Sequence, residues 1–310
     1  MDDWRRLQVY LLLILMPLFY SSNLVLGRHA VASSPPFALA FWRWTFAFLI
    51  LLPFAWRGLQ ASARPILAER RSLAGLGFLG MVVCGAGVYL ALRYTTATNA
   101  TLIYSAAPIM IVVLEWLWSG RRIGPVEGIG IAAAFVGVAA IVCQGDLAAL
   151  LAFRFNGGDL GIAAGAFCWA IYSLILRRPG LQAIPTLPLF AAIAGAGAVL
   201  LAPAAAVEAV LVGTPPATVE VWLSILGLAI VPSVLAFLTF QMGVKLVGPS
   251  LTGVFLYLMP IYGVLMAVIF LGEALRPYHA LGMVLTLSGV LLAGAQGSLR
   301  RLRDRRAAGA

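Results

Sequence analysis

Charged residues are scarce in this sequence, and their scarcity excludes an ordinary soluble domain. Only 10% of the 310 residues are charged, whereas 62% are hydrophobic, and the mean hydropathy is +1.00. Soluble domains carry about 25% charged residues. In lipid, only helices and closed barrels satisfy their backbone hydrogen bonds, and the apolar runs here have the length of membrane-spanning helices. The composition therefore predicts an all-α membrane protein.

Cysteine and histidine are also scarce, which argues against several kinds of site. The three cysteines show no C-x-x-C spacing, and the two histidines are His29 and His279. This pattern indicates neither a disulfide framework nor a zinc site, so we expect no metal and no cofactor. The sequence contains no Walker A or H-E-x-x-H motif, which argues against ATP-driven transport and zinc proteolysis. We therefore expect a protein that is not an enzyme.

Acidic residues are outnumbered by basic ones, and the placement of the basic residues indicates topology. The chain has 11 Asp and Glu against 21 Lys and Arg. The basic residues lie in short runs between apolar segments, which does not favour nucleic-acid binding. If the chain crosses the membrane ten times, sixteen Lys and Arg fall on the face that carries both termini and four on the other. Because cytoplasmic loops are rich in Lys and Arg, we expect a multi-pass protein of the cell (inner) membrane with cytoplasmic termini.

Ten apolar runs bounded by breaker residues predict ten transmembrane helices. The first run is too long for a cleaved signal peptide and is expected to stay in the protein. The residues after 299 are predicted to form a basic cytoplasmic tail, 300–310. The predicted helices cover residues 8–27, 35–56, 72–93, 97–119, 124–142, 158–177, 186–208, 219–243, 249–271 and 277–297.

An internal repeat relates the two halves of the chain, which we predict as 1–152 and 153–299. A shift of 152 residues aligns distinctive positions of five successive helices without a gap. Each half then has an odd number of spans, so the second half enters the membrane from the opposite side, as in the inverted repeats of many secondary transporters. The aligned pairs include Pro36 with Pro188, Arg93 with Lys245, Pro108 with Pro260, Pro125 with Pro277, Gly130 with Gly282, Gly137 with Gly289, and Tyr20-Ser21 with Tyr172-Ser173.

These repeated positions carry a resemblance to a known family. The pattern of Pro, Gly, charged residue, Pro and paired Gly that runs from Pro108 to Gly137, and again from Pro260 to Gly289, resembles the EamA modules of the drug/metabolite transporter superfamily. Arg43, within Phe41-Trp42-Arg43-Trp44, is also similar to that family's pattern. The resemblance implies a ten-helix carrier of two modules that exports amino acids or other small metabolites.

Prolines inside spans are candidate hinges, because proline removes a backbone hydrogen bond and bends a helix. The alternative is that membrane helices simply tolerate them. If they are hinges, replacing Pro108 or Pro260 with alanine should slow transport without preventing insertion. The candidates are Pro17, Pro108, Pro232 and Pro260.

Polar and aromatic residues within the spans are candidates for substrate binding, since an aromatic ring with a polar group can both stack on a solute and hydrogen-bond it. Trp169 is the best single candidate because it lies near mid-membrane. Tyr89 and Gln241 have the alternative of an interfacial aromatic or polar belt. The full set is Tyr20, Arg43, Tyr89, Asn99, Tyr104, Trp169, Tyr172, Gln241, Tyr257 and Tyr262.

Two ionisable residues within the spans are treated as functional hypotheses. Arg43 is expected to bind carbonyls or hydroxyls of neighbouring helices in preference to a substrate carboxylate. Glu115 is expected to pair with Arg121, Arg122 or another basic residue at the cytoplasmic end. The two lie at depths that differ by roughly 15 Å, so we do not expect them to pair with each other.

The sequence therefore predicts a secondary transporter that exports or facilitates the passage of amino acids, including aromatic and other neutral ones, and similar metabolites by alternating access. Phosphorylated substrates would need several cations within the membrane, and the spans offer Arg43 alone. The first span has no acidic residue for cation antiport. A channel-like facilitator and a membrane-embedded transferase are the alternatives. The expected partners are a small-molecule substrate and the lipid bilayer, and a monomer is favoured over a dimer.

Overall fold

The computed structural model describes residues 3–94, 103–104, 107–119, 124–142, 157–214, 218–271, 277–278, 280–289 and 291–292. Throughout this part of the chain the regular structure is helical, which confirms the all-α prediction. The first half contains α1 (Asp3–Ser33), α2 (Pro36–Ala61), α3 (Ala63–Ala68), α4 (Arg70–Gly77), η1 (Phe78–Gly87), α5 (Val88–Ala91), α7 (Ala107–Ser119) and α8 (Pro125–Val142). The second half contains α10 (Gly157–Ile175), α11 (Pro179–Gln182), α12 (Thr186–Leu211), α13 (Val219–Leu228), η2 (Ala229–Leu235), α14 (Ala236–Leu246), α15 (Pro249–Phe255), η3 (Leu256–Leu258) and α16 (Met259–Leu271).

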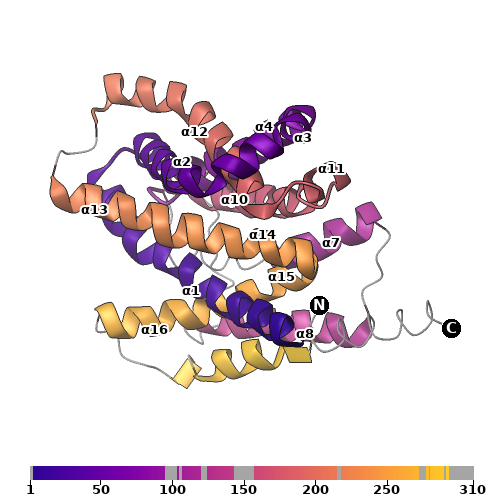
Figure 1. Cartoon of the computed structure of the whole chain (residues 1–310). Helices are drawn as coiled ribbons and strands as arrows, with labels where there is room; N and C mark the ends of the chain where they lie inside the picture. Colours follow the sequence, from indigo (N-terminus) through magenta and orange to yellow (C-terminus); the bar gives the residue numbers. More distant parts are fainter. Residues whose placement is uncertain are drawn as a thin grey trace.

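Four helical stretches among the described residues are long and apolar enough to cross a membrane. They are Pro36–Ala61, Arg70–Ala91, Thr186–Leu211 and Val219–Leu246. Shorter apolar helices include Gln8–Asn23, Pro125–Gly137, Leu160–Ile175, Leu251–Gly263 and Ala280–Gly289. In Figure 1, α2 and α12 lie at the top of the bundle and α8 and α16 at the bottom, with α1 passing between them. The chain therefore forms a multi-helix membrane protein, in which α1 packs on both α16 and the α13–α14 stretch.

Two of the long stretches are not uniform α-helices. The third predicted helix contains a π-helical segment, η1, and the eighth contains a second one, η2. A shift of 152 residues moves η1 onto residues 230–239, which overlap η2. A π turn inserts one extra residue into a helix and occurs often at functional sites. The same distortion thus occurs at matching places in the two halves, a detail that hydrophobic periodicity does not reveal.

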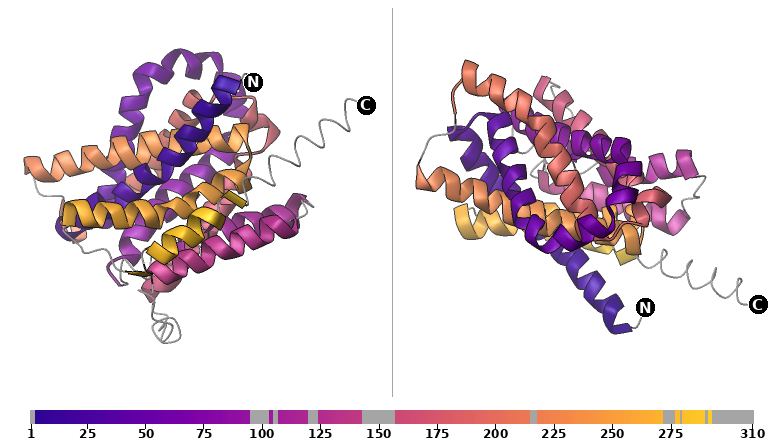
Figure 2. Two further views of the ribbon diagram at one scale, coloured as in Figure 1. Left: turned by 90° about the horizontal axis from the view of Figure 1, so that it is seen from below. Right: turned by 45° about the horizontal axis from the view of Figure 1, so that its top comes forward.

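The helices α2 and α12 pack against each other and run in opposite directions. The backbone N–H of Ala38, near the start of α2, donates a 2.7 Å hydrogen bond to the Glu208 carboxylate near the end of α12. At the other end, a methyl group on Gly58 would lie 3.1 Å from Cγ of Pro188. These two contacts show that α2 and α12 are antiparallel along most of their length. Figure 2 shows the bundle from two further sides.

A second antiparallel pair joins α8 to the helix Ala280–Gly289. A Cβ placed on Gly137 would lie 2.6 Å from the backbone nitrogen of Thr286 and 2.7 Å from the carbonyl oxygen of Gly282. A Cβ on Gly289 would lie 2.5 Å from both the nitrogen of Ala134 and the carbonyl oxygen of Gly130. Small residues allow membrane helices to approach this closely. The two contacts are reciprocal, since the 152-residue shift converts one into the other.

Adding one methyl group at this crossing should destabilise the protein. In Gly137→Ala, the Cβ would overlap backbone atoms that cannot rotate away, so the helices must separate at a cost of about 1–3 kcal/mol. Gly263→Ala is the matched control, because nothing lies within 4 Å of a Cβ there and alanine favours a helix by about 1 kcal/mol over glycine. We expect a lower Tm in detergent for the first variant and an equal or higher Tm for the second. Equal Tm values for wild type and Gly137→Ala would show that the crossing is not tight.

Candidate functional site

A cluster of seven aromatic side chains fills the interior between helices of the two halves. We call it the aromatic cluster. Trp169 stacks on Tyr172, with ring centroids 5.3 Å apart and planes inclined by 11°. Trp169 also meets Tyr20 edge-on at 5.6 Å. The cluster joins α1, α2, α10, α12 and α14, and its members are Tyr20, Trp44, Trp169, Tyr172, Phe190, Phe237 and Phe240.

Helical spacing explains how the sequence places these rings together. Phe240 and Gln241 lie three and four residues after Phe237 on α14, so each shares a helical face with Phe237. Trp169 and Tyr172 are three residues apart on α10 and project in the same way. Phe237 lies 5.2 Å from Trp169 and Phe240 lies 4.7 Å from it, measured between ring centroids. Two helical faces from the second half therefore meet in one aromatic layer, which Tyr20 from α1 completes.

Several polar atoms are buried in or beside the aromatic cluster. The Gln241 side-chain amide donates a 3.0 Å hydrogen bond to the Tyr172 hydroxyl. The Gln241 carbonyl oxygen, the Trp169 indole N–H and the Tyr20 hydroxyl have no hydrogen-bond partner among the described residues. Trp169 is 4% exposed and Gln241 is 1% exposed, so water does not solvate these atoms. Burying an unpaired polar group costs about 1–3 kcal/mol, and a polar ligand would recover that energy.

Arg43 lies at one edge of the aromatic cluster and binds four helical segments together. Its Nε–H donates to the Ser233 hydroxyl at 2.5 Å, and Nη1 donates to the Tyr89 hydroxyl at 2.5 Å and to Asn23 at 3.2 Å. The guanidinium carbon also lies 5.0 Å from the Trp44 ring centroid. We call Arg43, Asn23, Tyr89 and Ser233 the Arg43 group. These contacts confirm the expectation that neighbouring helices hold Arg43 through hydroxyl and carbonyl oxygens.

Pro232 explains why a serine hydroxyl is available to Arg43. Proline has no N–H and cannot bond the preceding turn, and the Ser233 hydroxyl instead donates a 2.7 Å hydrogen bond to the Leu228 carbonyl. The oxygen of Ser233 then accepts from Arg43. The Pro232 carbonyl lies 3.5 Å from Nη2 of Arg43 and accepts from it. The proline and its π-helical segment therefore shape part of the Arg43 group.

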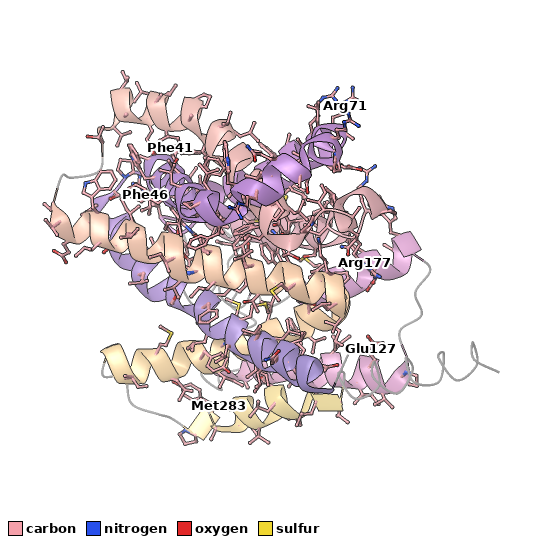
Figure 3. All side chains as sticks on the ribbon, in the orientation of Figure 1. Phe41, Phe46, Arg71, Glu127, Arg177 and Met283 are labelled. Carbon is pink, nitrogen blue, oxygen red and sulfur yellow. The ribbon has the colours of Figure 1, made fainter. Side chains whose placement is uncertain are left out.

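A second set of polar contacts holds the 177–184 connection, between α10 and α12, against the rest of the bundle. Arg177 and Glu115 form an ion pair of 2.9 Å, as expected for Glu115 with a basic residue at that end of the helix. Arg178 donates to the Ser72 hydroxyl at 3.2 Å. Figure 3 shows Arg177 at the end of α10, beside α7.

Two further contacts complete what we call the strap. Ser72 donates a 2.6 Å hydrogen bond to Glu69. Lys245, in the last turn of α14, donates to the carbonyl oxygen of Ile184. The strap therefore ties both ends of the 177–184 connection, one to α4 and α7 and the other to α14.

One face of η2 and α14 connects the three groups. Ser233, Phe237, Gln241 and Lys245 follow one another at intervals of four residues, so they line one side of the helix. Ser233 belongs to the Arg43 group, Phe237 and Gln241 to the aromatic cluster and its edge, and Lys245 to the strap. The aromatic cluster thus lies between the Arg43 group and the strap.

The other predicted site residues take varied positions. Tyr89 and Gln241 are both about 1% exposed and hydrogen-bonded inside the protein, so the belt alternative is wrong for both. Tyr104 is partly buried and lies beside the Cys84 thiol. Tyr257 is fully buried, and its hydroxyl has no partner in the described part of the chain. Tyr262 is partly buried, and Asn99 lies outside the described residues.

The candidate hinge prolines coincide in part with changes of helix type. Pro17 lies inside α1 and Pro232 inside η2. Pro260 is the second residue of α16, directly after the 3₁₀ turn η3. Pro108 is the second residue of α7, and the two residues before α7 are outside the described part. Two of the four prolines therefore lie at a π or 3₁₀ distortion, where bending is concentrated.

Sequence reasoning missed several members of these groups. The phenylalanines of the aromatic cluster, Trp44 and Asn23 were not among the predicted site residues. Ser233 carried a signal that was overlooked, because a serine next to a mid-helix proline can bond the carbonyl that the proline leaves free. The four-residue spacing from Ser233 to Lys245 is a second such signal.

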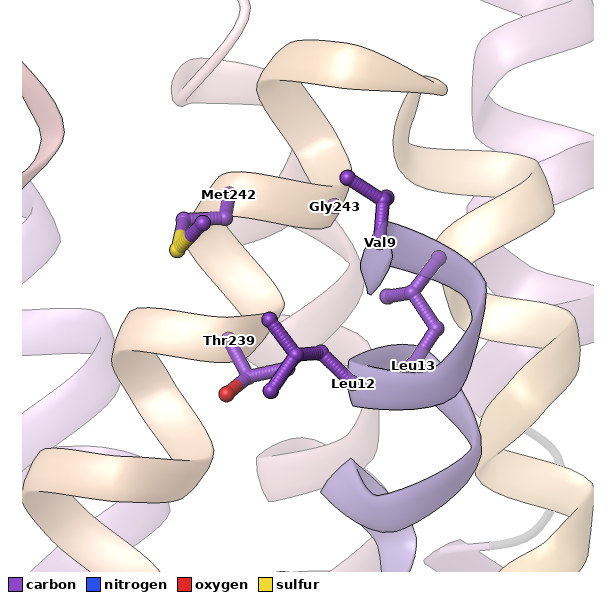
Figure 4. A pocket seen from close by; sticks show the side chains of 6 residues that line it. All are labelled: Val9, Leu12, Leu13, Thr239, Met242 and Gly243. Carbon is purple, nitrogen blue, oxygen red and sulfur yellow. The ribbon is translucent and has the colours of Figure 1, made fainter. Parts of the chain in front are cut away.

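A crevice on the surface between α1 and α14 is not the candidate site. It is lined by Val9, Leu12, Leu13, Thr239, Met242 and Gly243 (Figure 4). Thr239 supplies its one polar side chain. The lining offers no charge and little hydrogen-bonding capacity, so it suits a hydrocarbon chain better than a polar solute. Among the described residues no group of three or more His, Cys, Asp or Glu could hold a metal ion.

The apolar spans and buried polar groups define this chain as a helical integral membrane protein. The chain belongs to the EamA-like transporter family, whose pattern it matches twice, over residues 7–143 and 156–295. This membership confirms the resemblance noted in the sequence. The protein is therefore a transporter and not an enzyme.

Three known proteins illustrate the similarity. The "Uncharacterized transporter YyaM" of Bacillus subtilis (strain 168) is 28% identical over 293 residues, 93% of this chain and 94% of the relative. The "Aromatic amino acid exporter YddG" of Ancylobacter novellus is 29% identical over 187 residues, 58% of this chain and 61% of the relative. A solved structure, described as "Crystal structure of protein", superposes with a TM-score of 0.73 at 24% identity and covers 94% of this chain and 97% of its own. The last match shows a shared fold.

Proposed function

We propose that this chain is a secondary transporter that exports zwitterionic amino acids with aromatic or other apolar side chains, and binds them at the aromatic cluster. The observation that carries the proposal is the set of buried polar atoms on Tyr20, Trp169 and Gln241, which lie on or beside rings that can stack on a substrate. The relative named as an aromatic amino acid exporter supports the same substrate class.

The chemistry of this set matches the two ends of an amino acid. The Trp169 N–H and the Tyr20 hydroxyl are hydrogen-bond donors that would suit a carboxylate. The Gln241 carbonyl oxygen and the faces of the rings would suit an ammonium group, the latter through cation–π attraction. Arg43 already donates to three side chains and the Pro232 carbonyl, so we assign it to holding helices and not to binding the carboxylate.

We further propose ten spans in two inverted halves, 1–152 and 153–299, with a basic tail at 300–310. The antiparallel pairing of α2 with α12 supports this plan, because these are equivalent second helices of the two halves. The reciprocal glycine contacts and the matching π-helical segments support it too. In this topology the protein lies in the cell (inner) membrane with both termini in the cytoplasm. We propose that it acts as a monomer.

This proposed arrangement supports transport by alternating access. In the proposed topology the Arg43 group closes the outer side of the aromatic cluster, and the strap closes the cytoplasmic side. Under the 152-residue shift, Arg177 corresponds to Val25 and Glu115 corresponds to Ala267. The equivalent position on the outer side therefore cannot form this ion pair. We infer that an ion pair helps to close the cytoplasmic side and that the outer side lacks an equivalent one. We also infer that hinges allow the two sides to open in turn, at Pro17, Pro108, Pro232 and Pro260.

The substrate assignment is tested by uptake of radiolabelled amino acids into proteoliposomes. We expect phenylalanine, tryptophan and leucine to be carried, and aspartate and lysine to be carried much more slowly, since the cluster offers no free charge to pair with theirs. A pH gradient imposed in parallel assays tests proton coupling. If no amino acid is carried under any gradient, the substrate proposal is wrong, whereas the membership of the family stands.

Weakening the strap should favour the inward-open state. Glu115→Gln removes the ion pair with Arg177, whose side chain is 52% exposed, so the effect is modest, on the order of 1 kcal/mol or a fivefold population change. The readout is the labelling rate of Ile184→Cys by a maleimide, in a chain whose native cysteines are replaced by serine. We expect labelling to accelerate by up to about fivefold, and Arg93→Gln to leave it unchanged. An unaltered labelling rate in Glu115→Gln would show that this ion pair does not help to close the cytoplasmic side.

A further inference from the structure

Four exposed arginines gather where the end of α2 turns through α3 into α4. Arg57, Arg64, Arg70 and Arg71 lie within fifteen residues and all are solvent-exposed. Figure 3 shows the Arg71 side chain at this end of the bundle, projecting away from the helices. We call this region the arginine corner.

The arginine corner is poor in compensating negative charge. Between residues 54 and 77 the sequence has one acidic residue, Glu69. Its carboxylate already accepts a hydrogen bond from Ser72. Arg70 donates to the backbone carbonyl of Leu67 at 3.3 Å, a contact that orients the guanidinium without neutralising it. The corner therefore keeps most of its positive charge for an external anion.

Large apolar side chains adjoin these arginines and face away from the protein. Phe54 is 76% exposed, Trp56 is 53% exposed and Leu67 is 64% exposed. Tryptophan at such a position is typical of the interface between hydrocarbon and headgroups. A ligand that satisfies both features needs an anionic group beside acyl chains. A soluble anion would use the arginines and leave the apolar side chains exposed.

We propose that the arginine corner binds the phosphate headgroup of an anionic phospholipid. The proposal rests on the topology given above, which places this corner in the cytoplasmic leaflet. Guanidinium groups bind phosphate through paired, charge-assisted hydrogen bonds, and clusters of four or more basic residues next to a membrane helix favour anionic lipids. Each such residue contributes on the order of a fivefold gain in affinity.

A bound headgroup would also lie close to the strap. Ser72 of α4 accepts a hydrogen bond from Arg178, and α3 packs against α11 within the 177–184 connection. The lipid would thus fix the position of α3 and α4, against which the connection closes. The composition of the leaflet would thereby influence how firmly the cytoplasmic side is held.

The test compares lipid retention in the purified full chain by native mass spectrometry, after incubation with equal amounts of dioleoyl phosphatidylglycerol and dioleoyl phosphatidylcholine. We expect wild type to retain the anionic lipid preferentially. Substituting all four arginines with glutamine should reduce that preference at least tenfold, whereas substituting them with lysine, which keeps the charge, should largely preserve it. Arg93→Gln serves as a single-site control and should behave as wild type.

Three results would overturn the proposal. They are equal retention of the two lipids by wild type, unchanged preference in the glutamine variant, and displacement of phosphatidylglycerol by inorganic phosphate at constant ionic strength, which would indicate a site for a soluble anion. The measurement uses no substrate and no transport step. Failure of the amino-acid assignment would therefore leave this result interpretable.

Discussion

Replacing Trp169 with alanine should reduce the transport of an aromatic amino acid at least a hundredfold. The indole ring contacts Tyr20, Tyr172, Phe237 and Phe240, so its loss removes both the stacking surface and the N–H proposed for the substrate carboxylate. Truncating a buried tryptophan also costs about 3–5 kcal/mol of stability. Uptake is therefore measured per folded protein, as judged by size-exclusion chromatography in detergent.

Two further variants separate binding from folding. Trp169→Phe keeps an aromatic ring and removes the N–H, and we expect KM to rise about tenfold, the equivalent of one hydrogen bond, with a small change in kcat. Trp222→Ala is the matched control, because Trp222 packs in a separate aromatic group with Phe41, Trp42 and Phe46 between α2 and α13. If the Trp169→Ala protein folds and transports normally, the aromatic cluster is not the substrate site.

Replacing Arg43 with methionine should both destabilise the protein and abolish transport. The guanidinium donates to Ser233, Tyr89 and Asn23, and hydrogen bonds to charged groups are worth about 1.5–3 kcal/mol each. Because Tyr89 also donates to Asn23 at 2.9 Å, part of the network survives, and we expect a net loss of roughly 3 kcal/mol. The measurement is Tm in detergent together with uptake in proteoliposomes.

Conservative variants test whether geometry or charge matters at this position. Lysine keeps the charge but lacks the fork of donors, so Arg43→Lys should recover only part of the stability. Tyr89→Phe removes one acceptor and should cost less than Arg43→Met. If Arg43→Met retains wild-type Tm and transport, the Arg43 group neither stabilises the fold nor closes the outer side of the aromatic cluster.

The class of protein and most of the helical segments could be predicted from sequence because they depend on local hydropathy. In lipid, a run of about 20 apolar residues forms a membrane-spanning helix. The π-helical segments η1 and η2 could not be predicted, because they change the hydrogen bonding of a helix without changing its composition. The prediction of ten spans in inverted halves goes beyond local hydropathy and remains a proposal.

The individual site candidates were found more readily than their grouping. Trp169, Tyr172 and Gln241 stood out as polar aromatics or amides within spans, and the structure brings them together. Arg43 and Tyr89 were also predicted, but their shared contact depends on how α2 and α5 pack, which sequence spacing does not determine. Tyr257 was predicted on the same grounds and lies outside the ring contacts of the aromatic cluster. Long-range packing therefore decides which polar residues form a site.

The phenylalanines show a different limit of sequence reasoning. Phe237 and Phe240 carry no polar atom, so a search for hydrogen-bonding groups within the membrane passes over them. Phe237 lies about one turn before both Phe240 and Gln241, which indicates a shared helical face. That face becomes informative once Trp169 is known to pack there. Asn99 remains a prediction, because it lies outside the described residues.

Substrate counterflow is the sharpest test of whether this carrier moves amino acids through the aromatic cluster by opening its two sides in turn. Proteoliposomes loaded with unlabelled phenylalanine are diluted into a trace of labelled phenylalanine. Alternating access predicts a transient accumulation of label that saturates with substrate and is lost in Trp169→Ala. Non-saturable equilibration without accumulation would indicate a channel and rule out alternating access.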